Sequence, residues 1–286
     1  MGGMLRRFAP PLIVIAVLLA AALAPAAQAE PARGAVFSGT GLWIDIYDSY
    51  ERTPEKVVAV AVERGVPTIY VETSNAKSKR DVMYPDSLKQ LVLLAHQAGL
   101  RVIPWYLAGY KRTAIDRRRL QAAVRIGGTE PIDGLAIDIE STDVKSGPLR
   151  AKRAADMMVW LRQTYRDLPL GAIIPSPVHM YWPVFPYAEI YANADAFLPM
   201  CYTSKYLSVL KTYAESAQCV TKLREQVGDP AVPVTLIAGV ANHISPAQLD
   251  AAARGARDAG SNGFGLYDLA TTREDGWTAI ATWSAG

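Results

Sequence analysis

The sequence predicts one closed (β/α)8 TIM barrel, an α/β fold, and three observations support this fold class. About eight short apolar segments alternate with helical or loop segments over roughly 250 residues, the length that such a barrel needs. No stretch between these segments is long enough to act as a linker, so the sequence does not divide into further domains. The residues after the first apolar segment, Ile46 to Tyr50, contain no glycine, which argues against a glycine-rich dinucleotide-binding loop. Helical crossovers join parallel strands, and eight such units fit a closed barrel better than an open sheet.

Each predicted strand is an apolar run, often rich in β-branched or aromatic residues, that ends at polar or turn-forming residues. In chain order the predicted strands are Leu42–Ile46, Thr68–Glu72, Leu100–Tyr106, Asp133–Glu140, Leu170–Ile174, Ala196–Tyr202, Val234–Ala238 and Gly263–Tyr267.

The predicted helices carry apolar residues at helical spacing and are bounded by recognisable start and stop signals. Thr53-Pro54-Glu55 marks the start of the first helix, and Gly99 ends the second. In chain order the predicted helices are Pro54–Arg64, Asp86–Ala98, Thr113–Ile126, Leu149–Arg166, a region within Val209–Val227, Pro246–Ala259 and a short segment around Trp277.

The N-terminus has the pattern of an export signal. Arg6 and Arg7 precede an apolar run from about Pro10 to Leu23, and Ala27-Gln28-Ala29 is a small-residue cleavage site. We therefore predict a signal peptide at residues 1–29, a loose segment at residues 30–39 and the barrel at residues 40–286. An uncleaved membrane anchor is the alternative, although the apolar run is short for a span. We expect a secreted or cell-envelope protein with no stable membrane insertion after cleavage.

The charge balance argues against a nucleic-acid partner. The formal net charge of the whole sequence is +3, but two of its 30 basic residues, Arg6 and Arg7, lie in the predicted signal peptide. The mature chain then keeps 28 basic and 27 acidic residues and is nearly neutral. Because nothing in this balance favours binding to phosphates, we expect no nucleic-acid partner.

The few cysteines and histidines form no metal-binding pattern. Cys201 and Cys219 are the only cysteines, and export would permit a disulfide between them, with two buried thiols as the alternative. The three histidines, His96, His179 and His243, are scattered along the chain. We therefore predict neither a metal nor a cofactor.

Carboxylates and aromatic residues recur at the C-terminal ends of the predicted strands, which is the catalytic face of a (β/α)8 barrel. Aromatic rings stack on sugar rings, while carboxylates bind hydroxyl groups, so this mixture suits a polysaccharide or oligosaccharide. Some of these residues have structural alternatives, such as packing at the mouth, loop capping or an ion pair of Glu72 with Lys77 or Arg80. The residues concerned are Asp45, Glu72, Trp105, Tyr106, Asp138, Glu140, Tyr202, Tyr267 and Asp268.

The segment Asp133–Glu140 carries the strongest candidate site. In a strand, Ala136, Asp138 and Glu140 would share one face, and the intervening apolar residues would share the other. Two carboxylates then project together from an apolar strand. Because burying unpaired carboxylates is costly, such a strand end needs an ion pair, a metal or a chemical task.

The same segment resembles the fourth-strand motif of chitinase-like glycoside hydrolases of family 18, Asp-Gly-x-Asp-x-Asp-x-Glu. Met200-Cys201-Tyr202-Thr203 is similar to the sixth-strand motif of that family, Met-x-Tyr-Asp/Asn. The resemblance implies that Glu140 is the general acid and that Asp138 stabilises a substrate N-acetyl group acting as internal nucleophile. It also implies that Tyr202 hydrogen-bonds this group.

The sequence departs from the family pattern at several positions. Ala136 replaces the first aspartate of the motif, Thr203 replaces an acid or amide, and Tyr267 stands where many relatives have tryptophan. The Ser-x-Gly-Gly pattern near the third strand is absent, so family 25 muramidases or an uncharacterised hydrolase-like family are alternatives. The seventh predicted strand ends at Ala238 with no carboxylate nearby, which excludes the usual second glutamate of two-glutamate retaining enzymes.

We therefore hypothesise a monomeric, exported glycoside hydrolase that acts on a polysaccharide, such as an N-acetylated cell-wall glycan. A catalytically inactive barrel that binds carbohydrate through its aromatic rim is the second hypothesis. A third is a metal-dependent hydrolase with Asp45, Asp138 and Glu140 as oxygen ligands.

Overall fold

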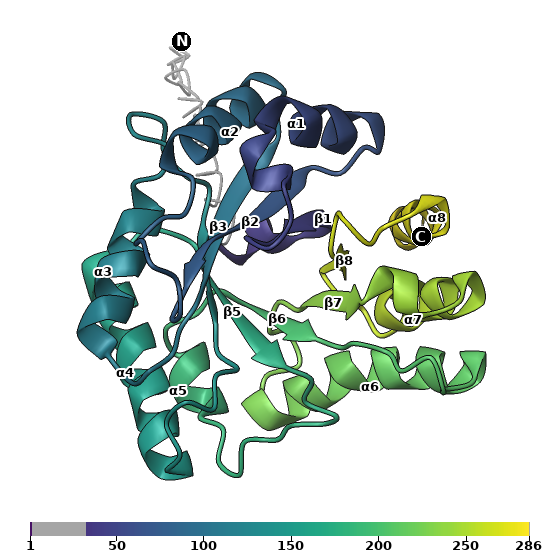
Figure 1. Ribbon diagram of the computed structural model, residues 1–286. Coiled ribbons are helices and arrows are strands. Elements are labelled where there is room, and N and C mark those ends of the chain that lie inside the picture. The colour runs from purple at the N-terminus through teal and green to yellow at the C-terminus, as the bar shows by residue number, and fades with distance from the viewer. Residues whose placement is uncertain (2–32, 286) are drawn as a thin grey trace. The chain divides into compact units, whose positions relative to one another are not determined.

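The chain folds into a closed barrel of parallel strands, as its sequence predicts (Figure 1). The computed structural model describes Met1 and residues 33–285. The strands follow one another around the barrel in chain order, and β8 closes the ring by pairing with β1. Apart from Met1, the predicted signal peptide lies outside the described residues. No helix in the part of the chain seen here is both long and apolar enough to cross a membrane.

The observed strands lie within a few residues of the predicted ones. They are β1 Gly39–Ile44, β2 Thr68–Asn75, β3 Arg101–Leu107, β4 Leu135–Asp138, β5 Leu170–Pro175, β6 Ala196–Met200, β7 Thr235–Gly239 and β8 Gly263–Tyr267.

The helices surround this barrel, and one of them, α5, was not predicted from the sequence. They are α1 Pro54–Glu63, α2 Pro85–Gln97, α3 Thr113–Val124, α4 Gly147–Thr164, α5 Tyr187–Tyr191, α6 Val209–Val227, α7 Pro246–Asp258 and α8 Glu274–Ser284. Helix α5 has only five residues, which is too few for a helical period to emerge from the sequence.

The inner space of the barrel is filled by aromatic rings. Trp43 of β1 and Tyr70 of β2 stack with ring centroids 4.2 Å apart and planes 4° apart, and both are fully buried. The neighbouring strands make room for them with glycines. A Cβ on Gly41 would lie 2.5 Å from the Tyr70 ring, and one on Gly265 would lie 2.7 Å from the Trp43 ring. The barrel is therefore a packed core, and only its C-terminal mouth can hold a ligand.

The segment before β1 is part of this core, which corrects the prediction of a loose stretch at residues 30–39 for the part described, residues 33–39. Arg33–Phe37 forms a 3-10 helix, and Phe37 is only 1% exposed. The Phe37 ring packs inside the barrel, where a Cβ on Gly171 would lie 2.7 Å from it. The Phe37 carbonyl also accepts a hydrogen bond from the Thr235 hydroxyl at 2.5 Å. The sequence does not reveal that this segment enters the core, because a single buried ring gives no periodic signal.

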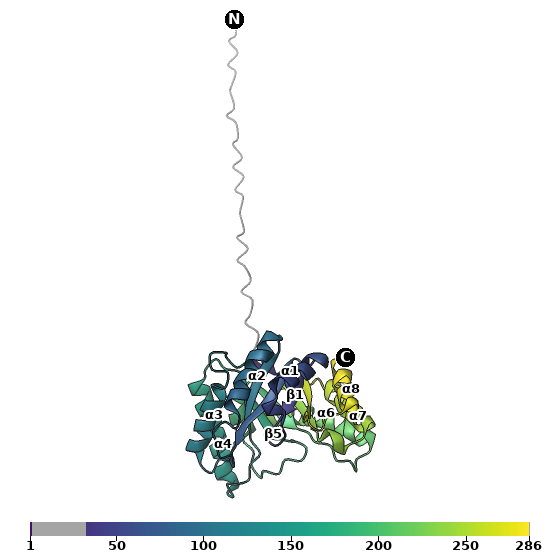
Figure 2. The same ribbon diagram turned by 45° about the horizontal axis from the view of Figure 1, so that its top comes forward.

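Helix packing covers the outer faces of the strands. Helix α8, at the C-terminal end, packs beside α7 and against β1 and β8 (Figure 2). Helix α7 begins with a capping box, in which the Ser245 hydroxyl accepts a hydrogen bond from Gln248 N–H and the Gln248 side chain accepts one from Ser245 N–H. Such local signals explain why the helix starts could be predicted from the sequence.

A disulfide joins Cys201, at the end of β6, to Cys219 in α6. The two Cα atoms are 6.4 Å apart, and both side chains are buried. Of the two alternatives that the sequence left open, the structure has the disulfide. The bridge fixes Cys201, the residue immediately before Tyr202. The disulfide therefore lies at the edge of the barrel mouth.

We predict that Phe37→Ala lowers the free energy of unfolding by about 3–5 kcal/mol, because it removes a fully buried ring and leaves a cavity. Urea unfolding followed by circular dichroism measures this change. The control is Phe185→Ala, at a half-buried position in the loop before α5, which should cost clearly less. Equal losses for the two variants would show that Phe37 is not part of the barrel core.

Candidate active site

Asp138 places a buried carboxylate at the end of β4, in the barrel mouth. Alternation along β4 packs Ala136 inside the barrel and Ile137 against the helices, so Asp138 follows Ala136 inward. Asp138 is 4% exposed, and its Oδ1 atom has no hydrogen-bond partner among the described residues. Burial raises the pKa of Asp138 well above its usual range, and the neighbouring carboxylates of Glu140 and Glu72 raise it further.

Glu140 lies two residues beyond Asp138 and lines an open cavity of 370 Å³. Its side chain is half-buried, and this burial raises the pKa of Glu140. The backbone carbonyl of Glu140 accepts hydrogen bonds from the Tyr181 hydroxyl at 2.8 Å and from Trp182 Nε1 at 3.2 Å. In the described chain, no cation forms an ion pair with the Glu140 carboxylate. The main chain is thus held in place while the acid group faces the cavity.

Glu72 is a third carboxylate at the mouth, and it is only 1% exposed on β2. It accepts hydrogen bonds from Ile46 N–H at 3.2 Å and from Asn75 Nδ2 at 3.3 Å. Burial raises the pKa of Glu72 to about 8. The β2–β3 register shifts between Glu72 and Ser74. Residues three apart in a regular strand face opposite sides, so this bulge returns Asn75 to the side of Glu72.

Tyr267 of β8 and Asp45, next to the end of the neighbouring strand β1, are linked at the mouth. The Tyr267 hydroxyl donates a hydrogen bond to Asp45 Oδ2 at 2.7 Å, and the other Asp45 oxygen accepts one from Tyr47 N–H at 2.8 Å. Burial and the bond to Asp45 raise the pKa of the Tyr267 hydroxyl. Asp45 therefore caps the loop after β1, as the structural alternative proposed, and also fixes an aromatic residue at the mouth.

A grouping of acids with the spacing of a cation site lies beside this link. One oxygen from each of Asp45, Asp48 and Asp268 lies within 4.8 Å of the others, and these are ligands that a hard cation accepts. Burial raises the pKa of Asp268, and the carboxylate of Asp45 adds to this shift. Among the residues described here, this is the only such grouping. The metal set hypothesised from the sequence, Asp45 with Asp138 and Glu140, is not assembled.

Tyr202 follows β6 and lies beside Tyr267 at the mouth. Its side chain is 37% exposed, and it lines a cavity of 550 Å³ together with Thr203 and Gly239. The Tyr202 ring lies 5.9 Å from the Tyr267 ring, centroid to centroid. Burial raises the pKa of the Tyr202 hydroxyl, and the carboxylate of Asp138 is the next largest cause. The hydroxyl end thus points to the acids while the ring edge stays accessible.

The structure brings seven of the nine predicted site residues together at the mouth. They are Asp45, Glu72, Asp138, Glu140, Tyr202, Tyr267 and Asp268.

The two aromatic residues of β3 face opposite sides of the strand, and neither lines the cavities at Glu140 and Tyr202. Trp105 is 5% exposed and packs inside the barrel against Trp43, with ring centroids 6.2 Å apart. Tyr106 is fully buried on the outer side of β3, where its hydroxyl donates a hydrogen bond to Asp116 of α3 at 2.6 Å. The prediction that Tyr106 contacts substrate is wrong, because successive strand residues face opposite sides and Trp105 takes the inner one.

The ion pair suggested for Glu72 is also absent. Within the described residues, neither Lys77 nor Arg80 pairs with Glu72, whose partners are Ile46 and Asn75. Glu72 points into the barrel, whereas both cations lie in the loop that follows the strand.

Three further residues of the site follow predicted strand ends but are not among the nine candidates. Tyr47, Asn75 and Tyr181 line the same cavity as Glu140, and the Asn75 amide donates to the Tyr47 hydroxyl at 2.8 Å. Tyr47 and Asn75 lie within three residues of predicted strand ends, so the sequence also places them at the rim. Tyr181 reaches Glu140 through a loop whose path leaves no signal in the sequence.

This arrangement of carboxyl groups suits acid–base chemistry. Neighbouring carboxyl groups in a poorly hydrated mouth resist simultaneous ionisation, so at least one keeps a proton well above the usual range for an acid. Glu140 faces the open cavity and can give or take a proton, while Asp138 is enclosed beside it. The phenol group of Tyr202 supplies a hydrogen-bond donor near the pair, whereas the Tyr267 hydroxyl is occupied by Asp45.

Solved structures with the same fold include several chitinases. A plant class V chitinase mutant from Cycas revoluta, in complex with (GlcNAc)3, matches with a TM-score of 0.66 and 10% identity, over 87% of this chain and 100% of the other. A chitinase from Chromobacterium violaceum matches with a TM-score of 0.60 and 11% identity, over 87% and 99% of the two chains. The Bacillus cereus spore cortex-lytic enzyme SleL matches with a TM-score of 0.60 and 8% identity, over 86% and 74%.

The chain shares its fold with these chitinases. No protein-family model and no curated protein sequence matches it. The expected fold resemblance to family 18 is thus found in three dimensions, since one of the solved structures is a family GH18 chitinase from Cycas revoluta. At identities near 10% the shared property is the barrel.

We predict that Glu72→Gln flattens the pH dependence of stability. The folded pKa of about 8 exceeds the usual value of 4.5, so Glu72 favours the folded state at low pH, and this contribution is lost as the pH rises through 8. Glutamine cannot ionise. The variant should therefore gain stability relative to the parent by about 1.4 kcal/mol for each pH unit between these values.

Urea unfolding from pH 5 to pH 9 measures the difference. Glu225→Gln, an exposed change on α6, serves as the control and should leave the pH slope unchanged. If the free energy of unfolding changes with pH equally in Glu72→Gln and in the parent, Glu72 ionises normally in the folded protein.

Proposed function

We propose that the protein is an exported glycoside hydrolase that cleaves an N-acetylated polysaccharide such as a cell-wall glycan. The observation that carries this proposal is the pair of adjacent acids, Asp138 and Glu140, at the mouth of the barrel. Glu140 faces an open cavity, and Asp138 is buried beside it with a raised pKa. This is the arrangement that proton donation to a leaving oxygen requires.

In the proposed reaction, Glu140 donates its proton to the glycosidic oxygen as the bond from C1 to that oxygen breaks. The carbonyl oxygen of the substrate N-acetyl group attacks C1 and forms a cyclic oxazolinium intermediate. Asp138 stabilises the positive charge on this group, and Tyr202 donates a hydrogen bond to it. Water then attacks C1 and gives a proton to the Glu140 carboxylate, which restores the acid.

The end of β7 supports the use of a substrate group as nucleophile. There Gly239 and Val240 line the mouth, and no carboxylate stands where a two-glutamate retaining enzyme would need one. The fold neighbours support an N-acetylated substrate, because one of them holds (GlcNAc)3 and another is a spore cortex-lytic enzyme.

Two features support export. The first 29 residues have the pattern of a signal peptide. The disulfide between Cys201 and Cys219 suits an oxidising compartment outside the cytosol.

A non-hydrolytic carbohydrate-binding barrel is the second candidate. It is favoured by Ala136, which replaces the carboxylate expected next to Asp138 on the inner face of β4. With alanine there, Oδ1 of Asp138 has no hydrogen-bond partner in the described chain. Release of reducing ends from the glycan separates the two candidates, since a binding protein releases none.

We predict that Glu140→Gln lowers kcat on soluble N-acetylated oligosaccharides by about 10²–10⁴-fold, because glutamine has no proton to give. Reducing-end release measures the rate, and the melting temperature shows that the fold persists. Glu225→Gln, the exposed control on α6, should keep full activity. Equal rates for Glu140→Gln and the parent would refute the catalytic role. Binding without any cleavage by the parent would favour the second candidate.

A further inference from the structure

The cavity at Glu140 continues into a second one along the barrel rim. The first measures 370 Å³ and the second 420 Å³, and both are lined by Ala76, Lys77 and Asp143. The second cavity lies between the loop after β2 and the loop after β3, and Gly109 and Arg112 belong to its lining. Because the two share three residues, they form one groove that leads away from Glu140.

Three cations line the far part of this groove without partners. Lys77, Lys111 and Arg112 are exposed, and none of them has a carboxylate within ion-pair distance among the described residues. Elsewhere on the chain, cations such as Arg118 and Arg64 are paired, with Asp81 and Glu274 respectively. Unpaired cations inside a groove are available to an anionic ligand.

Two acids line the second cavity, but they do not cancel these cations. Asp116 is 2% exposed, and its carboxylate accepts hydrogen bonds from the Tyr106 hydroxyl at 2.6 Å and from Gly109 and Tyr110 N–H at 3.3 and 3.0 Å. These hydrogen bonds within the protein therefore occupy the Asp116 carboxylate. Asp143 is the remaining free carboxylate in the second cavity, against three cations.

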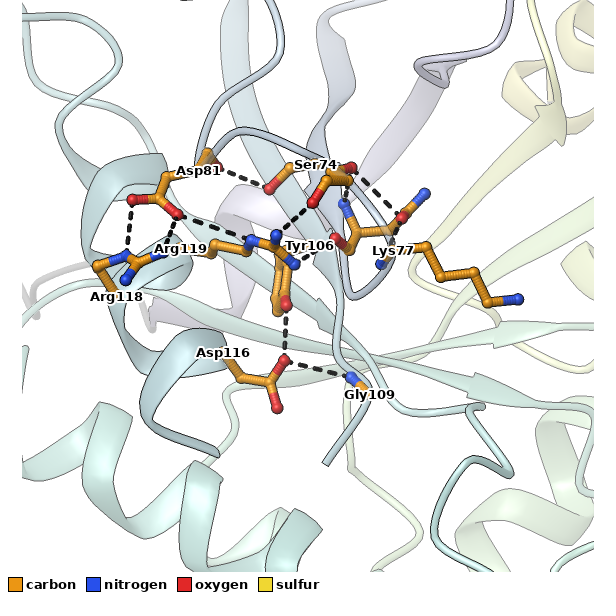
Figure 3. Close-up of polar contacts among 10 residues, drawn as sticks. Ser74, Lys77, Asp81, Tyr106, Gly109, Asp116, Arg118 and Arg119 are labelled. Carbon is orange, nitrogen blue, oxygen red and sulfur yellow. Dashed lines mark hydrogen bonds and ion pairs between the residues drawn. The ribbon is translucent and has the colours of Figure 1, made fainter. Parts of the chain in front are cut away.

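A buried polar network holds both loops in place (Figure 3). Arg119 of α3 donates hydrogen bonds to the carbonyls of Asn75 at 2.6 Å and Ser78 at 2.5 Å, on either side of Lys77. Asp81 joins this network through an ion pair with Arg119 at 3.7 Å, and it also pairs with Arg118 at 2.8 Å. In Figure 3 the Lys77 side chain extends away from the network. The loop is thus anchored from behind while Lys77 points outward.

The second loop is packed directly against the first. A Cβ on Gly109 would lie 2.6 Å from the Ala76 side chain, so only glycine fits there. The next residue, Tyr110, has a positive φ of 58°, a conformation that its hydrogen bond to Asp116 and packing of its ring maintain. Lys111 and Arg112 come immediately after Tyr110 in the chain, so the same contacts set their positions.

We propose that this groove binds an anionic substituent of the glycan, a carboxylate or a phosphate, through Lys77, Lys111 and Arg112. The substrate class is then an anionic N-acetylated glycan rather than a neutral one. This inference rests on the proposed function, because that function places the reacting bond at Glu140. The selection of a charged ligand itself requires only that the glycan binds.

Binding by the Glu140→Gln variant tests the inference, because it separates affinity from cleavage. The probes are soluble N-acetylmuramic-acid-containing glycan strands with free carboxylates, the same strands after amidation, and N-acetylglucosamine oligomers phosphorylated at O6. Amidation should weaken binding by about tenfold, since each exposed ion pair contributes up to about 1 kcal/mol. Binding of the phosphorylated oligomers shows whether the groove accepts a phosphate group in place of a carboxylate.

Adding Lys77→Gln and Arg112→Gln to the Glu140→Gln variant should abolish the preference for charged strands. The affinity for amidated strands should stay unchanged. The control is Lys79→Gln, an exposed change in the same loop that lines neither cavity and should keep the preference. Equal affinity for charged and amidated strands, or no binding of either, overturns the inference. Charge-selective binding with no cleavage by the parent refutes the proposed function alone.

Discussion

The stack of Trp43 on Tyr70 inside the barrel is the packing on which the rest of the structure depends. It fills the centre, with glycines on the neighbouring strands at the points of closest approach, and Phe37 adds a third ring. A filled centre prevents any ligand from entering the barrel. The acids that point inward lie above the rings, near the C-terminal ends of the strands, and are therefore concentrated at one mouth.

Concentrating acids above an aromatic layer has an electrostatic consequence. Asp138 and Glu72 are almost fully removed from water, and burial raises the pKa of both. A cluster of this kind destabilises the folded protein at high pH, which is a cost that a purely structural arrangement could avoid by pairing the acids with cations. Glu140 differs from its neighbours because it alone combines a raised pKa with an open cavity.

The loops around the mouth are fixed by contacts outside the site. Tyr181 and Trp182 hold the main chain at Glu140, the Cys201–Cys219 disulfide anchors the residue before Tyr202, and Arg119 holds the loop that carries Lys77. Each of these supports binds backbone or an adjacent residue and leaves the functional side chain free. Rigid support behind exposed groups is what a pre-organised binding site requires.

The sequence by itself determined the barrel and the position of its main acids. Strand and helix periods are local properties, and the alternation along β4 correctly separated Asp138 from Ile137. Only the tertiary structure decided that Trp105 rather than Tyr106 faces inward, that a bulge turns Asn75 toward Glu72, and that Phe37 enters the barrel. These features depend on register, bulges and loop paths, which contacts between distant parts of the chain set. A pattern along the chain can place a residue at a strand end, but only the packed fold determines what that residue meets there.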